Sequence, residues 1–137
     1  MTTATTTVAD QVVDAYVTGD ADALANLCAD DILIDVVVPT WRFQVAGRET
    51  LRHVAAQEEF LPGRTVAWHQ RTDTAAGVLL EIESWAPMEG EDRKWHELNH
   101  FRIEDGQVVE FVQYCSGIWD AATIKRQQAE APMVRPR

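Results

Sequence analysis

Apolar residues recur at helical spacing near the N-terminus and alternate with polar residues over most of the second half of the chain. Val8, Val12 and Tyr16 share one helical face, and Gly19 predicts the end of this helix because glycine readily adopts the left-handed C-cap conformation. Asp20 is typical of the N-cap of a second, shorter helix. The apolar residues of that second helix are Leu24, Leu27 and Cys28.

One strand and a third helix are predicted next. Residues 31–38 are rich in β-branched side chains and end at Pro39, a pattern that favours a strand. The third helix follows Gly47 and should end at the Pro-Gly pair of residues 62–63. Its apolar side consists of Leu51, Val54 and Ala55.

The remainder of the chain is predicted to be almost entirely strand. The expected strands are residues 65–72, 78–85, 95–103 and 107–116. Asp120 is typical of the N-cap of a final helix that holds Ala121, Ile124 and Lys125. Helices gathered before a run of strands indicate an α+β fold. We expect a curved antiparallel sheet that wraps around the N-terminal helices and leaves an internal pocket at its open end.

The last two predicted strands place amide side chains on an apolar face. The dipeptide Asp105-Gly106 between them is a strong hairpin signal. Alternation puts Asn99 on the face of Phe101, and Gln113 on the face of Phe111. A buried amide costs stability unless it has a partner, so this face is expected to line a cavity that holds a ligand.

Length and charge limit the possible classes of function. The 137 residues predict one domain spanning 1–137, with flexible ends at 1–6 and 131–137. A net charge of −10 argues against nucleic acid or an anionic membrane as a partner. No apolar run is long enough to span a bilayer, and the first residues lack the pattern of a secretory signal. We therefore expect a cytoplasmic protein.

No residue pattern calls for a metal or a cofactor. Cys28 and Cys115 do not form a disulfide framework or a metal-binding motif, and we expect both to be buried apolar residues. Histidines are scattered along the chain, and a glycine-rich phosphate loop is absent. We expect no metal site and no nucleotide cofactor.

Three stretches of the chain resemble the NTF2-like superfamily, which includes ketosteroid isomerases, scytalone dehydratases, limonene epoxide hydrolases and SnoaL-like polyketide cyclases. The stretches are residues 14–20 with 27–31, residues 47–51, and residues 99–103 with Gly106 and the final strand. They cover most of the chain in the right order. The resemblance implies a cone-shaped α+β fold and a homodimer. It leaves the reaction open because the superfamily carries many unrelated chemistries.

The resemblance also implies roles for individual residues. Tyr16 lies where isomerases and dehydratases keep a functional tyrosine, and Asn99 lies where isomerases keep a protonated aspartic acid that binds the oxyanion. The position of the isomerase base corresponds to Val36 or Val38, with Asp35 beside it. The acidic and basic positions of epoxide hydrolases read Glu97, Asn99 and Gln113 here.

Four residues are the candidates for catalysis. Tyr16 and Asn99 would stabilise an oxyanion, and His69 or Asp35 would carry the proton. His69 serves as the base if it points inward. Asp35 serves if a bulge turns it inward, because in a regular strand it shares the outer face with Asp31 and Leu33.

The predicted function is a cofactor-independent isomerase, cyclase or dehydratase that moves a proton on a hydrophobic, cyclic small molecule. Gln113 would orient this substrate. The candidate apolar walls of its site are Trp41, Phe43, Trp68, Phe111 and Trp119. Two alternatives remain open at this point. One is a limonene-type epoxide hydrolase, which lacks its paired aspartates here, and the other is a non-catalytic module for ligand binding or dimerisation.

Overall fold

A six-stranded curved sheet with three helices on one face forms the body of the protein. This computed structural model describes residues 6–135, so most of the predicted flexible ends, 1–5 and 136–137, lie outside the described residues. The helices are α1 (Val8–Thr18), α2 (Ala21–Asn26), α3 (Arg48–Val54), the π-helix η1 (Ala55–Glu59) and α4 (Ala121–Glu130). The strands are β1 (Cys28–Val38), β2 (Trp41–Ala46), β3 (Thr65–Thr74), β4 (Gly77–Met88), β5 (Glu91–Glu104) and β6 (Gln107–Cys115).

Gly19, Asp20 and Asp120 cap helices as predicted, but α2 ends at Asn26, so the predicted helix residue Cys28 lies on β1. Thr7 forms a capping box with Asp10 at the start of α1, and Gly19 closes α1 in the left-handed conformation with φ 77°. Asp20 and Asp120 accept backbone N–H groups at the starts of α2 and α4. Among the described helices, none is both long and apolar enough to cross a membrane.

The sheet is mixed, which corrects the prediction of a purely antiparallel sheet. Its strand order is β2-β1-β6-β5-β4-β3, and β1 runs parallel to β6 while all other neighbours are antiparallel. Strand β2 was not predicted, although Trp41, Phe43 and Val45 alternate in sequence. A tight turn in which Thr40 has φ 64° folds β2 back along β1, so the other edge of β1 is left for the last strand.

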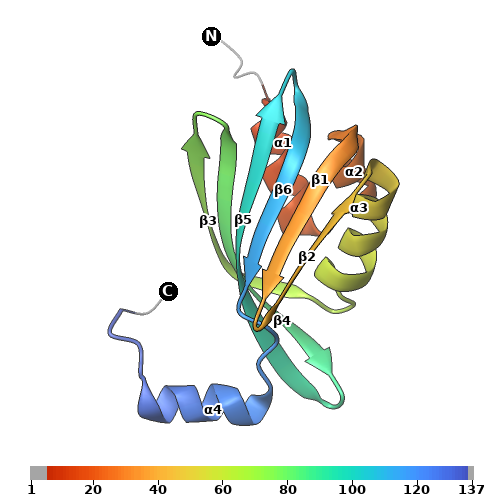
Figure 1. The fold of residues 1–137 in the computed structure, drawn as a ribbon. Coiled ribbons are helices and arrows are strands. Elements are labelled where there is room, and N and C mark those ends of the chain that lie inside the picture. Colours follow the sequence, from red (N-terminus) through yellow and green to blue (C-terminus); the bar gives the residue numbers. More distant parts are fainter. Residues whose placement is uncertain (1–5, 136–137) are drawn as a thin grey trace.

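The core lies between the concave face of the sheet and the helices. Figure 1 shows α1, α2 and α3 against one face of the sheet, while α4 lies across its end, apart from the other helices. Val12 and Tyr16 of α1 are fully buried. Phe101 of β5 and Phe111 of β6 stack in the centre, with ring centroids 4.8 Å apart. The concave face is therefore packed with apolar side chains along most of its length.

Candidate active site

Five polar side chains form one buried cluster on the concave side of the sheet. They come from α1, η1, β5 and β6 and are Tyr16, Glu59, Glu97, Asn99 and Gln113. Each of these residues is no more than 6% exposed. A polar cluster of this size inside a small domain is costly unless its members satisfy one another.

Tyr16 and Gln113 join the two carboxyl groups of the cluster. The Tyr16 hydroxyl donates to Glu97 Oε1 at 2.7 Å and lies 3.1 Å from Glu59 Oε2. Gln113 Nε2 donates to Glu59 Oε2 at 2.8 Å and to Asn99 Oδ1 at 3.0 Å. The Asn99 amide nitrogen lies 3.4 Å from the carbonyl oxygen of Leu80 on β4. Gln113 Nε2 also lies 3.1 Å from the Tyr16 hydroxyl, so Gln113 connects the helix phenol to Asn99.

The elements explain why these side chains meet. Glu97 and Asn99 alternate with outward-facing residues on β5, and Asn99 is the direct cross-strand partner of Gln113. Glu59 ends the π-helix, whose wide turn is closed by a bond from the Phe60 N–H to the Ala55 carbonyl. Phe60 then packs edge-on against the Tyr16 ring at 5.1 Å.

Burial strongly changes the protonation of the cluster. Burial, followed by the negative charge of Glu59, raises the pKa of Glu97 well above its ordinary value. Burial also raises the pKa of Glu59, but hydrogen bonds from Gln113 and Tyr16 oppose this shift. The pKa of Tyr16 is raised well above its ordinary range by burial and by both carboxyls, so the phenol remains a donor. The two carboxyls therefore titrate as a coupled pair, and their surroundings favour the protonated form more strongly at Glu97 than at Glu59.

A cavity of about 350 Å³ opens beside the two carboxyls. Its polar lining includes Glu58, Glu59, Glu97 and Gln113. The remaining walls are Val36, Val38, Phe43, Trp95, Cys115, Gly117 and Ile118. Tyr16 and Asn99 are not among the lining residues and lie behind the carboxyls. Burial raises the pKa of the Cys115 thiol to about 11. At neutral pH this thiol is therefore protonated, and it lines the cavity without acting as a nucleophile.

The predicted catalytic residues divide between this cluster and two positions outside it, the buried Asp35 and the exposed His69. Tyr16 and Asn99 belong to the cluster, as predicted from their faces. Asp35 lies on the outer face of β1, where its carboxylate binds Arg42 at 2.6 Å and Gln44 at 3.0 Å. No bulge turns Asp35 inward, since β1 pairs in regular register with β2 from residue 33 onward. His69 is exposed on the edge strand β3 and lies outside the cluster.

The residues predicted as walls of the site lie in the cavity, in the core and on the outer side of the sheet. Phe43 and Gln113 line the cavity beside the carboxyls, whereas Phe111 belongs to the core. Trp41 begins β2 and is 69% exposed, directly across from the cavity residue Val38. A bulge between Val66 and residue 68 turns Trp68 to the outer face. There it stacks on His96 and lines a different cavity, together with Trp119.

Glu59 was not singled out from the sequence, and Glu97 was noted only as a departure from the epoxide hydrolase pattern and not as a candidate for catalysis. Glu97 precedes Asn99 by two positions, so alternation places it on the same inward face. Glu59 follows Leu51 and Ala55 at intervals of four, which continues the buried side of the third helix. Both signals were readable, but neither shows that the two acids meet.

One spacing departs from the expectation that no residue pattern calls for a metal. The sequence His96-Glu97-Leu98-Asn99-His100 has the spacing that binds zinc when it lies on a helix. Here it lies on β5, where residues four apart are separated by roughly 13 Å along an extended strand. Its two histidines face outward, and His96 contacts Glu81 at 3.2 Å. Within residues 6–135, no group of three metal-binding side chains comes together.

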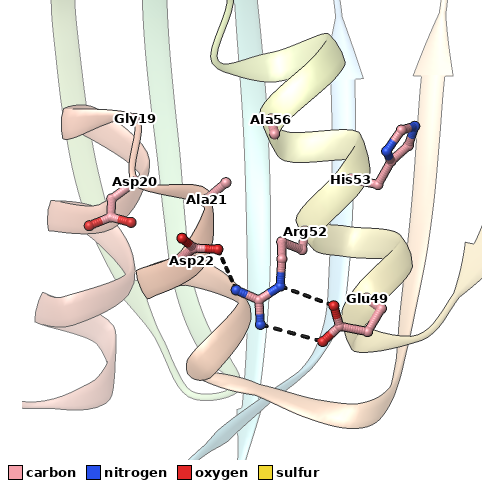
Figure 2. Close-up of a pocket in the computed structure, with 8 residues that line it drawn as sticks. All are labelled: Gly19, Asp20, Ala21, Asp22, Glu49, Arg52, His53 and Ala56. Atoms are coloured by element: carbon pink, nitrogen blue, oxygen red, sulfur yellow. Dashed lines mark hydrogen bonds and ion pairs between the residues drawn. The ribbon is translucent and has the colours of Figure 1, made fainter.

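A larger depression of about 680 Å³ lies between α2 and α3 (Figure 2). Its polar groups already bind one another, because Arg52 contacts Asp22 at 2.5 Å and Glu49 at 3.1 Å. Both acidic partners are well exposed to solvent, and Figure 2 shows His53 turned away from them. This surface has no buried reactive group comparable to the carboxyl pair.

Comparison with known proteins agrees with the fold. The model of the SnoaL-like domain family matches residues 9–111. Comparison with curated proteins gave no match.

Solved structures show the same fold at low sequence identity. An NTF2-like protein from Anabaena variabilis has a TM-score of 0.68 at 15% identity, over 80% of this chain and 87% of that one. An LEH-like epoxide hydrolase from M. tuberculosis has a TM-score of 0.59 at 15% identity, over 87% and 84%. A phenazine biosynthesis-related protein from Pseudomonas aeruginosa has a TM-score of 0.63 at 13% identity, over 95% and 85%. The chain belongs to the SnoaL-like domain family and has the fold of NTF2-like proteins.

Proposed function

We propose that this protein is a cofactor-independent enzyme that moves a proton on a compact hydrophobic substrate by general acid–base catalysis. The observation that carries the proposal is the pair Glu59 and Glu97, two buried carboxyls that line one apolar cavity and share hydrogen bonds to Tyr16 and Gln113. Two carboxyls whose surroundings separate their pKa values are suited to opposite roles in one reaction.

Glu59 is the proposed base and Glu97 the proposed acid. Glu59 receives the Gln113 amide hydrogen at 2.8 Å, a contact that favours its ionised form. Glu97 faces the charge of Glu59 in a buried setting, which favours its protonated form. The assignment replaces His69 and Asp35 as candidates because those two side chains lie outside the cluster.

The reaction that fits this arrangement begins with a substrate carbonyl. Glu59 removes a proton from the carbon next to the carbonyl, and Glu97 gives its proton to the carbonyl oxygen, so that an enol forms. Return of a proton to another carbon gives an isomer, loss of a neighbouring hydroxyl as water gives a dehydration, and attack of the enol carbon on a second carbonyl closes a ring. All three outcomes use the same two carboxyls.

Tyr16 and Asn99 are proposed as positioning residues. Neither lines the cavity, so direct contact with a substrate oxyanion does not fit their place behind the carboxyls. Tyr16 holds Glu97 through the 2.7 Å bond, and Asn99 fixes the amide of Gln113 at 3.0 Å. Gln113 keeps its proposed contact with the substrate because it does line the cavity.

The cavity favours a small apolar molecule. About 350 Å³ is near the lower end of the range for ligand pockets, and the walls opposite the carboxyls come from Val36, Val38 and Phe43. Such walls exclude water and strengthen each hydrogen bond inside. A cyclic ketone with one or two rings is the substrate class that we propose.

Carbon-bound deuterium exchange tests the proposal without knowledge of the final product. The protein is incubated in D₂O with a panel of monocyclic and bicyclic ketones, and loss of the α-proton signals is followed by NMR. We expect catalysed exchange for at least one ketone, with a loss of at least about 100-fold in Glu59→Gln and in Glu97→Gln. Glu104→Gln, at an exposed position on β5, should keep the wild-type rate. Exchange that survives in Glu59→Gln would remove this residue as the base.

Epoxide hydrolysis is the second candidate, and the paired acids favour it. The paired aspartates of limonene-type epoxide hydrolases are lacking here, but Glu59 and Glu97 provide a pair of acids at the cavity. Glu59 would take a proton from water as the water oxygen attacks a ring carbon, and Glu97 would protonate the departing epoxide oxygen. Diol formation from cyclic epoxides, without exchange of ketone α-protons, would favour this reaction. Binding of both compound classes without turnover would favour a non-catalytic module.

A further inference from the structure

Arg64 lies directly behind the buried cluster, between η1 and β3. Its Nη2 donates to the carbonyl oxygen of Tyr16 at 2.6 Å and to that of Val17 at 2.8 Å, in the last turn of α1. Its guanidinium lies over two aromatic rings, 5.8 Å from the centroid of Tyr16 and 4.9 Å from that of Phe60. Arg64 thus contacts both Tyr16, which binds Glu97, and the residue that follows Glu59.

The partners of Arg64 are unusual for this chain. Arg42, Arg52 and Arg71 each form a salt bridge with an aspartate. Within residues 6–135, Arg64 forms no salt bridge, and it donates hydrogen bonds to two backbone carbonyls. A partly buried guanidinium without a paired carboxylate keeps its full charge, because arginine does not deprotonate in proteins.

Among the groups around the carboxyl pair, the positive charge of Arg64 acts on the carboxyls themselves. The titratable and charged groups that influence the pair from the packed elements are Tyr16, Glu58, Cys115 and Arg64. Arg64 is the cation of this set, and its charge interacts with Tyr16, Glu97 and Glu59. Low-dielectric surroundings carry such an interaction over a longer distance than water does.

We propose that Arg64 is a positioning residue that supplies the counter-charge for the single negative charge of the Glu59–Glu97 pair. It holds the last turn of α1 through two carbonyls and thereby holds the Tyr16 phenol against Glu97. Its positive charge favours the singly ionised pair over the doubly protonated pair. The proposal rests on the proposed function only where it concerns the effect of Arg64 on turnover. The effect of Arg64 on the ionisation of the pair can be measured without a substrate.

A simpler role would be structural. A cation bound to the last carbonyls of a helix stabilises that helix, whether or not an active site is nearby. A purely structural arginine would lower the melting temperature when it is replaced, but it would not shift the titration of the carboxyls. The titration of the carboxyls therefore distinguishes the two roles.

The test is a carboxyl titration by NMR on protein labelled with ¹³C-glutamate, with the two signals assigned from Glu59→Gln and Glu97→Gln. Arg64→Met removes the charge and keeps an apolar stem over the rings, and we expect the first ionisation of the pair to move up by about one pH unit. Arg64→Lys keeps the charge, so its titration should stay within about 0.3 pH unit of wild type even if the protein melts earlier. Arg52→Met, on α3 and paired with exposed acids, should leave the titration unchanged.

Two results would overturn the proposal. One is an unchanged titration in Arg64→Met, and the other is an equal upward shift in Arg64→Lys. If Arg64→Met does not fold, Arg64→Gln removes the same charge with a polar side chain, and an unchanged titration in Arg64→Gln would overturn the proposal in the same way. Neither result bears on Glu59 and Glu97 as catalytic groups, which deuterium exchange tests separately.

Discussion

Replacing Glu97 with Gln should make the protein more stable at neutral pH while abolishing its proposed activity. Glu97 is 1% exposed, and its surroundings favour the neutral form. A Gln side chain has nearly the same shape, accepts the Tyr16 hydrogen bond and donates toward Glu59 as a protonated carboxyl does. We therefore expect little change in packing, so that the change in the free energy of unfolding comes from the loss of the titrating carboxyl.

The size of the effect follows from linkage between protonation and folding. In the unfolded chain Glu97 ionises at about pH 4.3, but the folded protein keeps its proton to a higher pH because the folded pKa is raised. Between these two pKa values the native state binds more protons than the unfolded state, so the free energy of unfolding falls as pH rises. The slope for one proton is about 1.4 kcal/mol per pH unit, and it applies from the unfolded pKa up to the raised folded pKa.

Urea denaturation followed by tryptophan fluorescence measures this difference at several pH values. Glu97→Gln lacks the titrating group, so its stability relative to wild type should rise by about 1.4 kcal/mol per pH unit over this range. Subtracting wild type from variant cancels the contributions of the carboxylates whose pKa is lowered, such as Asp10 and Asp120, which titrate at lower pH. Glu104→Gln serves as the exposed control and should show no such trend. A difference that stays constant with pH, or that falls, would refute a protonated Glu97 in the native state.

Three further substitutions test the cluster, the core and the surface. Tyr16→Phe removes the donor to Glu97, and we expect a loss of about 1–2 kcal/mol in the free energy of unfolding and a much larger fall in turnover than in substrate affinity. Unchanged turnover would remove Tyr16 from the mechanism. Phe101→Ala leaves a cavity against Phe111 and should cost about 3–5 kcal/mol in urea denaturation; a loss below about 1 kcal/mol would contradict this packing. Asp35→Asn breaks a bond to the exposed Arg42, so deuterium exchange should keep its wild-type rate, and a large loss would restore Asp35 as the base.

The local pattern of the sequence determined most elements and the direction of most side chains. Spacing along α1 placed Tyr16 inside, and alternation along β5 and β6 placed Asn99 and Gln113 on the concave face. Capping residues marked the helix ends because their effect depends only on neighbours a few positions away. These predictions needed no knowledge of distant parts of the chain.

Tertiary structure decided which of the inward-facing groups meet. Tyr16 contacts Glu97 across 81 positions of sequence, and Gln113 contacts Glu59 across 54, so no local period could reveal either contact. The π-helical turn, the parallel pairing of β1 with β6 and the bulge in β3 were equally hidden, because each depends on partners far along the chain. The sequence thus determined which faces are buried, whereas the three-dimensional packing brought together the two acids on which the proposed chemistry depends.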